Sequence, residues 1–183
     1  MAPKGITGVT VNTLLTEILP AIVVPIALGW LTNSATRNEL QTWYRNLKKP
    51  SWTPPDSAFP IVWTILYAMM GYASWLIYQS GPMSVIRFPL IMYAVQLLLN
   101  ISWSPIFWKA HAKNMALYEI CALWVAIASC IIIFYPLNKV ASYLMMPYLA
   151  WVTLATALNY RIAKDNPRKG RTSPAGRINS KLT

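Results

Sequence analysis

Five long stretches of the sequence contain no charged residue. Each is mostly apolar, and together they cover residues 18–36, 57–86, 88–108, 120–138 and 140–160. A helix needs about 20 residues to cross the hydrocarbon of a bilayer, and no stretch alternates like a barrel strand. Because unpaired backbone amides are not tolerated in lipid, we predict an all-α integral membrane protein, a bundle of five transmembrane helices. The predicted membrane domain is residues 1–165, with spans at about 11–33, 57–79, 84–108, 115–136 and 139–163.

Basic residues gather on one side of the predicted spans. Two loops and the segment from Arg161 onward carry most of the 16 Lys and Arg residues, and this excess predicts that their side, with the C-terminus, is cytosolic. Residues 166–183 have the composition of a basic, disordered cytosolic tail. The net charge of +11 would suggest nucleic acid for a soluble chain. Here the cations flank the membrane, so we expect the lipid bilayer and no nucleic acid as partner.

Conventional catalytic and metal-binding groups are scarce. The sequence has a single histidine, His111, and two cysteines, Cys121 and Cys130, that lie about 13 Å apart along one predicted helix. The two thiols cannot form a disulfide with each other. No zinc or iron site can be assembled from these residues. We therefore expect no metal and no required cofactor.

Aromatic side chains recur at helical spacing on three predicted spans. The three stripes are Trp63, Tyr67 and Met70; Asn100, Trp103 and Phe107; and Trp151, Ala155 and Leu158. Residues three or four apart share a helix face, so each stripe carries a flat ring beside smaller groups. Helix packing explains one such stripe. Three stripes, with Asn100 as a polar group at membrane depth, favour a cavity for a large planar apolar ligand.

Three longer segments resemble a known family. They read WYRNLKKPSWTPPDSAFPIVWTILYAMMGYASWLIY, QLLLNISWSPIF and PYLAWVTLATALNYRIAKDN. In this order, between Trp43 and Asn166, they resemble the translocator protein family, also called the TspO/MBR or tryptophan-rich sensory protein family and formerly the peripheral-type benzodiazepine receptor. The resemblance implies five helices around a cavity that is capped by the first cytosolic loop. It also implies binding of porphyrins, sterols and synthetic ligands.

The resemblance assigns roles to individual residues. The implied ligand-binding residues are Phe59, Pro60, Trp63, Tyr67, Asn100, Trp103, Phe107, Trp151, Ala155 and Leu158. Trp63 and Trp151 match the pair that is implied in light- and oxygen-dependent breakdown of protoporphyrin IX. The segment with Leu158, Tyr160 and Lys164 matches a sterol-recognition pattern, which is weak by itself.

Prolines and two departures from the family pattern complete these expectations. Pro50, Pro54 and Pro55 restrict the backbone of the predicted first cytosolic loop, so we expect a stiff cover above Trp63. Met115 stands where animal members have a tryptophan. Residues 91 and 95 are larger than the small residues that dimerising members often carry, so a homodimer is left open.

Together these features predict a membrane protein that binds tetrapyrroles, such as protoporphyrin IX or haem, in a tryptophan-lined cavity. Cholesterol and other sterols form a second expected ligand class, and the expected role is transport or stress-related handling of these molecules. Two alternatives stay open, namely a porphyrin-degrading enzyme and a membrane adaptor without a small ligand. The mitochondrial outer membrane is the expected compartment, with the endoplasmic reticulum or a bacterial membrane as alternatives.

Overall fold

The computed structural model describes residues 10–34 and 37–167. All regular secondary structure in these residues is helical. Five helical segments are long and apolar enough to cross a membrane: Val11–Thr32, Ala58–Tyr78, Met83–Lys109, Lys113–Phe134 and Lys139–Asp165. The predicted fold class, an all-α membrane protein with five spanning helices, is confirmed. Most of the predicted C-terminal tail lies outside the described residues.

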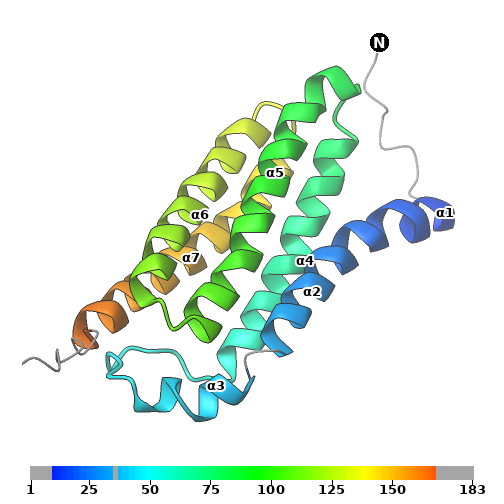
Figure 1. The fold of residues 1–183 in the computed structure, drawn as a ribbon. Helices are drawn as coiled ribbons and strands as arrows, with labels where there is room; N and C mark the ends of the chain where they lie inside the picture. The colour runs from blue at the N-terminus through cyan, green and yellow to red at the C-terminus, as the bar shows by residue number, and fades with distance from the viewer. Residues whose placement is uncertain (1–9, 35–36, 168–183) are drawn as a thin grey trace, which may run out of the picture.

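The first spanning helix is continuous but irregular near its start. Its segments are α1 (Val11–Thr13), the π-helical turn η1 (Leu14–Ile18) and α2 (Leu19–Ser34). Pro20 has no N–H to donate to the carbonyl of Thr16, so the regular ladder is interrupted there. The N–H of Leu19 instead bonds the carbonyl of Leu14, five residues back. The N-terminal part of this helix, around α1, diverges from the neighbouring helices (Figure 1).

A carboxylate joins the irregular start of the first helix to helix α4 (Ala58–Tyr78). Glu17 accepts hydrogen bonds from Nε1 of Trp75 at 3.1 Å and from Nε2 of Gln79 at 2.6 Å. Both donors lie near the end of α4, so the carboxylate is satisfied where the two helices approach the membrane surface. These contacts hold the irregular segment against the bundle.

Helices α2 and α4 approach so closely that their backbones touch at a glycine. A Cβ atom added to Gly71 would collide with the carbonyl oxygen of Ala21 and would lie 2.8 Å from Cα of Ile22. Small residues permit this kind of approach, which is a main source of helix association in membranes. Gly71 therefore sets the distance between the first two spans.

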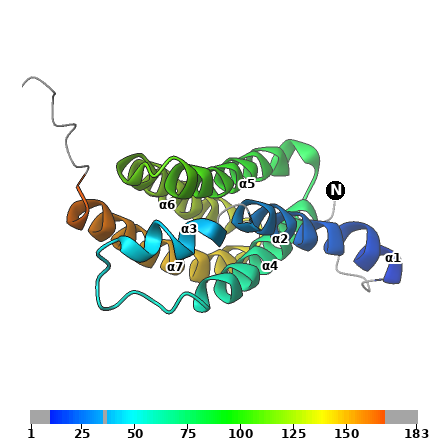
Figure 2. The same cartoon turned by 60° about the horizontal axis from the view of Figure 1, so that its bottom comes forward.

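The remaining spans complete the bundle. They are α5 (Met83–Ser104), which continues into the π-helical turn η3 (Pro105–Lys109), α6 (Lys113–Phe134) and α7 (Lys139–Asp165). Helix α6 lies between α5 and α7, and α4 lies between α2 and α7, as Figures 1 and 2 show. The side chain of Asn138 caps α7 by accepting from the N–H of Ala141 at 3.1 Å. Spanning helices that follow one another in the chain run in opposite directions along the bundle.

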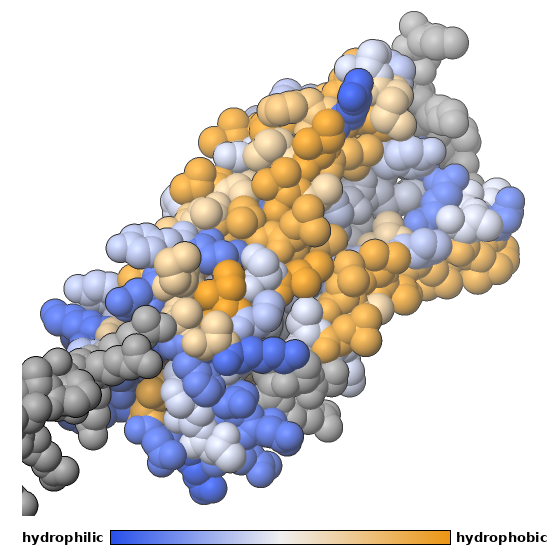
Figure 3. All heavy atoms as spheres, in the orientation of Figure 1, coloured by the Kyte–Doolittle hydropathy of each residue, from blue (hydrophilic) through white to orange (hydrophobic). Residues whose placement is uncertain are grey.

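One end of the bundle carries the longest connection between spans. This connection contains α3 (Arg37–Gln41) and the 3-10 turn η2 (Tyr44–Asn46), followed by the proline-rich loop that leads into α4. The end of η3, the start of α6 and the end of α7 lie at the same end (Figure 1). Figure 3 shows a hydrophilic surface there, whereas the flanks of the helices are mostly hydrophobic. The distribution is that of a protein with its flanks in lipid and its ends in water.

Candidate ligand site

A buried hydrogen-bond bridge joins three helices at the centre of the bundle. The hydroxyl of Tyr67 on α4 donates to Oδ1 of Asn100 on α5 at 2.6 Å. Nδ2 of Asn100 donates to the hydroxyl of Tyr148 on α7 at 2.8 Å. All three residues are buried. Asn100, a polar group at membrane depth, thus has two hydrogen-bond partners.

Aromatic rings of α4 and α7 meet above this bridge in two successive layers. The Trp63 ring stacks on Tyr67 with centroids 5.6 Å apart, and it meets the edge of Tyr148 at 6.1 Å. One turn earlier on α4, Phe59 meets Trp151 edge to face at 5.7 Å. Because α4 and α7 run in opposite directions, residues four apart on one helix meet residues three apart on the other. The structure therefore brings Trp63 and Trp151, one residue from each of two predicted stripes, into contact with an aromatic ring of the facing helix.

The indole of Trp151 carries a donor without a partner. Its Nε1 atom is buried and makes no hydrogen bond in the described part of the chain. The ring borders a narrow crevice whose walls are Pro54, Phe59, Trp151, Leu154, Ala155 and Leu158. Tryptophan N–H groups usually have an acceptor when they are buried. A ligand with an acceptor atom could supply one here.

This crevice is small. Its volume is about 10 Å³, which is close to the lower limit for a single water molecule. A macrocycle needs far more room than the crevice between the rings of Phe59 and Trp151 provides. A tetrapyrrole could enter only if Pro54 and Phe59 moved away from Trp151. The proline-rich loop is thus a wall of the site as well as its cover.

The third predicted stripe, on α5, forms a separate aromatic layer nearer the end of the bundle. Trp103 stacks on Phe107 with centroids 4.7 Å apart. Its Nε1 donates to Oδ1 of Asn159 on α7 at 3.2 Å, and Nδ2 of Asn159 donates to the carbonyl of Lys113 at 2.9 Å. A single buried amide therefore fixes the Trp103 ring relative to both α7 and the start of α6.

The connection between the first two spans covers this layer. The Trp43 ring meets Phe107 edge to face at 5.4 Å and stacks on His111 at 4.1 Å. His111 in turn pairs with Glu39 at 2.9 Å. Burial, together with the nearby negative charge of Asp56, raises the pKa of Tyr44 to about 12. Tyr44 is therefore neutral and packs as an apolar group under physiological conditions.

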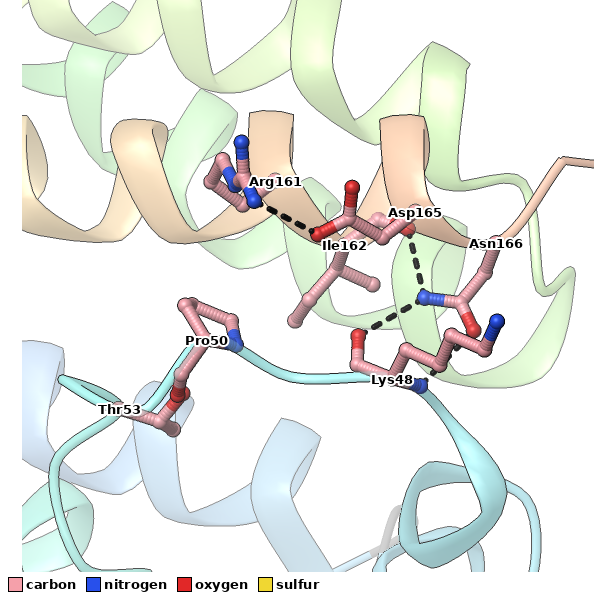
Figure 4. Close-up of polar contacts among 7 residues, drawn as sticks. All are labelled: Lys48, Pro50, Thr53, Arg161, Ile162, Asp165 and Asn166. Atoms are coloured by element: carbon pink, nitrogen blue, oxygen red, sulfur yellow. Dashed lines mark hydrogen bonds and ion pairs between the residues drawn. The ribbon is translucent and has the colours of Figure 1, made fainter.

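The proline-rich loop is tied to the end of α7 by one side chain, as Figure 4 shows. Oδ1 of Asn166 accepts from the N–H of Lys48 at 2.9 Å, and Nδ2 of Asn166 donates to the carbonyl of Lys48 at 2.9 Å. A turn follows in which the N–H and hydroxyl of Thr53 both donate to the carbonyl of Pro50, at 3.1 and 2.7 Å. The amide of Asn166 thus pairs with the loop backbone as a neighbouring strand would.

Substitution of Asn166 by alanine is expected to release this loop. Both hydrogen bonds to Lys48 are lost, and each contributes about 0.5 to 1.5 kcal/mol. Trypsin cleavage between Lys48 and Lys49 should therefore accelerate about 5- to 150-fold in the folded protein. Cleavage after Lys109, at the end of η3, serves as the internal reference.

Asn166→Asp is the matched control for this experiment, because it keeps an acceptor for the Lys48 N–H and loses only the donor. We expect an intermediate cleavage rate for this variant. Equal rates for the wild-type protein and Asn166→Ala would contradict the role of Asn166 as the tie between loop and helix.

Some predicted site residues lie away from the crevice. Pro60 is exposed, and its carbonyl accepts from the hydroxyl of Thr64 at 2.7 Å. In the predicted sterol segment, Leu158 is buried, whereas Tyr160 is 50 % exposed and has Lys164 Nζ 5.9 Å from its ring centroid. Positions two apart on a helix point in nearly opposite directions. Leu158 therefore faces the bundle interior, and Tyr160 with Lys164 faces outward.

Met115 is also distant from the ring layers that border the crevice. Its side chain is 63 % exposed, and it borders a separate hollow of about 80 Å³ together with His111, Lys113 and Asn166. The methionine is therefore not a wall of the narrow crevice beside Trp151.

Four residues at the site were not among those predicted from the sequence, and one of them is Leu154, a wall of the crevice. Tyr148 bonds Asn100 and contacts Trp63, Asn159 fixes Trp103, and Pro54 borders the crevice. Tyr148 lies three residues before Trp151, so extending the α7 stripe by one turn would have found it. Asn159 stands next to Leu158, and a polar residue on the inner side of a spanning helix is itself a signal.

Comparisons with known proteins agree with this architecture. The family model described as the TspO/MBR family matches residues 21–164. The tryptophan-rich protein TspO of Chlorobaculum tepidum is 37 % identical over 143 residues, which cover 78 % of this chain and 90 % of that protein. The human translocator protein is 39 % identical over 136 residues, covering 72 % and 80 %. The protein CrtK of Rhodobacter capsulatus is 32 % identical over 128 residues, covering 68 % and 79 %. The chain therefore belongs to the TspO/MBR family of membrane proteins.

Proposed function

We propose that this protein binds a planar, largely apolar ligand of the tetrapyrrole class between α4 and α7, beneath the proline-rich loop. The observation that carries the proposal is the buried Nε1 of Trp151, which has no acceptor among the described residues and borders the crevice. Protoporphyrin IX and haem combine a large ring face with carboxylate acceptors at the edge. Such a molecule can stack on the indole rings and also accept from the free N–H group.

The surroundings of Trp151 support a site that opens when the ligand binds. Two residues close the crevice. Pro54 belongs to the proline-rich loop, and Phe59 belongs to the first turn of α4. Below them, the bridge from Tyr67 through Asn100 to Tyr148 provides a firm floor. A ligand that displaces the cover therefore meets exposed ring faces on a rigid base. Ordering cost is limited, because the prolines already restrict the loop.

Removal of the Trp151 ring is expected to weaken protoporphyrin IX binding about 10- to 100-fold. The ring supplies a stacking face and the N–H group a hydrogen bond, each worth about 0.5 to 1.5 kcal/mol. Trp151→Ala loses both contributions, whereas Trp151→Phe keeps an aromatic face and should lose only about three- to tenfold. Titration of intrinsic tryptophan fluorescence with protoporphyrin IX in nanodiscs measures the affinity.

Trp30→Phe is the control, because it also removes one indole but lies on the outer surface, 57 % exposed, with Thr64 as its hydrogen-bond partner. Its affinity should equal that of the wild-type protein. If Trp151→Ala and Trp30→Phe bind protoporphyrin IX equally well, the site is not at Trp151.

The same titration separates the other functions that the sequence left open. A sterol that uses the crevice would compete with protoporphyrin IX, whereas one that uses the outward face of Tyr160 and Lys164 would not. Illumination of the complex in air tests porphyrin breakdown, with Trp63→Phe as the comparison for a role of that indole. A chain that binds none of these ligands would act as an adaptor.

We also propose that the end of the bundle with the proline-rich loop faces the cytosol. Lys48, Lys49, Lys109 and Lys113 lie at this end, in agreement with the excess of basic residues on cytosolic sides of membrane proteins. Relatives occur in both bacteria and mammals. The mitochondrial outer membrane is the proposed compartment for a eukaryotic chain. A homodimer is left open, because the exposed Ile91 and Val95 on α5 are larger than the small residues that permit close helix approach.

A further inference from the structure

The connection between the first two spans is fastened to the rest of the bundle at two places of different chemistry. One is the side-chain amide of Asn166, whose two hydrogen bonds to the backbone of Lys48 join neutral groups. The other is the pair of Glu39 and His111, in which Oε2 and Nε2 are 2.9 Å apart. This second fastening contains a side chain of the type whose charge changes between pH 5 and 8.

The imidazole of His111 is held at its edge and on its face by the same connection. The carboxylate of Glu39 contacts Nε2, and the Trp43 ring stacks on the imidazole with centroids 4.1 Å and planes 16° apart. Trp43 in turn meets Phe107 edge to face at 5.4 Å. A single imidazole therefore joins α3 and the turn after it to the end of the third span.

The backbone that carries His111 is fixed between η3 and α6. Its φ angle is 50°, in the left-handed region, which histidine adopts more often than most non-glycine residues and which persists where the surroundings determine it. The N–H of the next residue, Ala112, donates to the carbonyl of Ile106 at 3.1 Å. Because this turn is fixed, the connection with Glu39 and Trp43 is the partner that can move.

Charged groups on neighbouring elements decide which form of His111 the structure favours. Glu39 on α3 and the face of the Trp43 ring both attract a positive charge. Two lysines oppose it: Lys109 ends η3, and Lys113 begins α6, borders the same hollow as His111 and has Nζ 5.8 Å from the Trp43 ring centroid. The carboxylate is in direct contact with the imidazole, so its attraction dominates. The residues that α7 and its end add to the hollow have no titratable side chain: Ala163, Asn166 and Pro167.

We propose that Glu39 and His111 form a pH-sensitive latch that holds the connection closed while the imidazole is protonated. Carboxylates stay ionised between pH 5 and 8, so the ion pair is present at the acidic end of this range. As the pH rises, the imidazole loses its charge, and a hydrogen bond and the ring stack are left. Both side chains are partly exposed, 40 % for His111 and 31 % for Glu39, so the equilibrium for opening should change about two- to fivefold.

The latch has a consequence for the crevice beside Trp151. Pro54, one of the crevice walls, belongs to the same connection as Glu39. Release of the latch should therefore ease the movement of Pro54 that a large ligand requires. This consequence rests on the proposed tetrapyrrole site, whereas the latch itself does not.

Hydrogen exchange of the ligand-free protein in nanodiscs tests the latch. Protection of the amides of residues 38–47, corrected for the intrinsic exchange rate at each pH, should fall about two- to fivefold from pH 5 to pH 8. Glu39→Gln should show the lower protection at both pH values. His111→Arg should show the higher protection at both, because a guanidinium remains charged, stacks on aromatic rings and pairs with carboxylates.

Asn166→Ala is the control for a purely structural contact. It should lower the protection at both pH values and leave their ratio unchanged, since the bonds to Lys48 join neutral groups. Equal protection of the wild-type protein at pH 5 and pH 8 would overturn the proposal. An unchanged ratio in Glu39→Gln would overturn it as well.

The rate of protoporphyrin IX association tests the consequence for the crevice. Wild-type protein and His111→Arg are compared at the same pH, so titration of the ligand cancels. At pH 8 the variant should bind about two- to fivefold more slowly, and at pH 5 the two rates should agree. Equal rates at pH 8 would overturn the link between latch and crevice. Absence of binding by both proteins would contradict the tetrapyrrole site, and the exchange measurement would still decide the latch.

Discussion

Asn100→Leu is expected to lower the melting temperature of the protein by about 6 to 12 °C. The substitution leaves the hydroxyls of Tyr67 and Tyr148 without their shared partner in a buried, low-dielectric place. Each unpaired group costs about 1 to 3 kcal/mol, so the total is about 3 kcal/mol, and a chain of this size loses about 2 to 4 °C per kcal/mol. The measurement is thermal unfolding of purified protein in a fixed detergent or nanodisc.

The matched control removes the bridge completely. In the triple variant with Tyr67→Phe and Tyr148→Phe, no polar group is left unpaired at the bridge, so part of the stability lost in Asn100→Leu should return. Ligand affinity should still fall, because Trp63 stacks on Tyr67 and meets Tyr148. A loss below about 2 °C for Asn100→Leu would show that the bridge contributes little to the fold.

Gly71→Ala is expected to be still more damaging, although it adds only one methyl group. The new Cβ would overlap the backbone carbonyl of Ala21 and crowd Cα of Ile22. Backbone atoms cannot yield as a side-chain end can, so α2 and α4 must separate and lose contact along their length. Overpacking typically costs about 1 to 3 kcal/mol and occasionally more. We expect about 3 kcal/mol or more, measured as the shift of the unfolding midpoint.

Gly81→Ala is the control for this prediction. A Cβ there would meet Val85 at 3.7 Å, which is ordinary van der Waals contact, so the melting temperature should stay within about 2 °C of the wild-type value. Equal effects of the two substitutions would show that helix spacing at Gly71 is not limiting.

The two predictions are connected through the first helix. Gly29 on α2 lies directly against the Tyr67 ring, and an added Cβ there would be only 2.9 Å from Cδ2. Helix α2 therefore supports the tyrosine that donates to Asn100. Separation of α2 from α4 in Gly71→Ala should consequently weaken the floor of the ligand site as well as the fold.

Helix number and the inner faces of the helices could be read from the sequence, because both are local properties. Charge-free stretches of about 20 residues identify spans, and a spacing of three or four residues identifies a face. The stripes with Trp63 and Trp151 were therefore predicted correctly as inward-facing sets, and Asn100 as a buried polar group. Leu158 and Tyr160 face opposite sides of α7, which also follows from local helix geometry. The sterol-recognition pattern, in contrast, treats the two residues as parts of one site.

Contacts between distant segments were decided only by the tertiary structure. The partners of Asn100 are 33 and 48 residues away, and Asn166 is 118 residues from Lys48. Neither helical periodicity nor composition contains information about which faces of different helices meet. The crevice beside Trp151 arises in the same way, because its walls come from the proline-rich loop, α4 and α7. The sequence alone determined which residues are turned inward; packing of the helices against one another decided which of them touch.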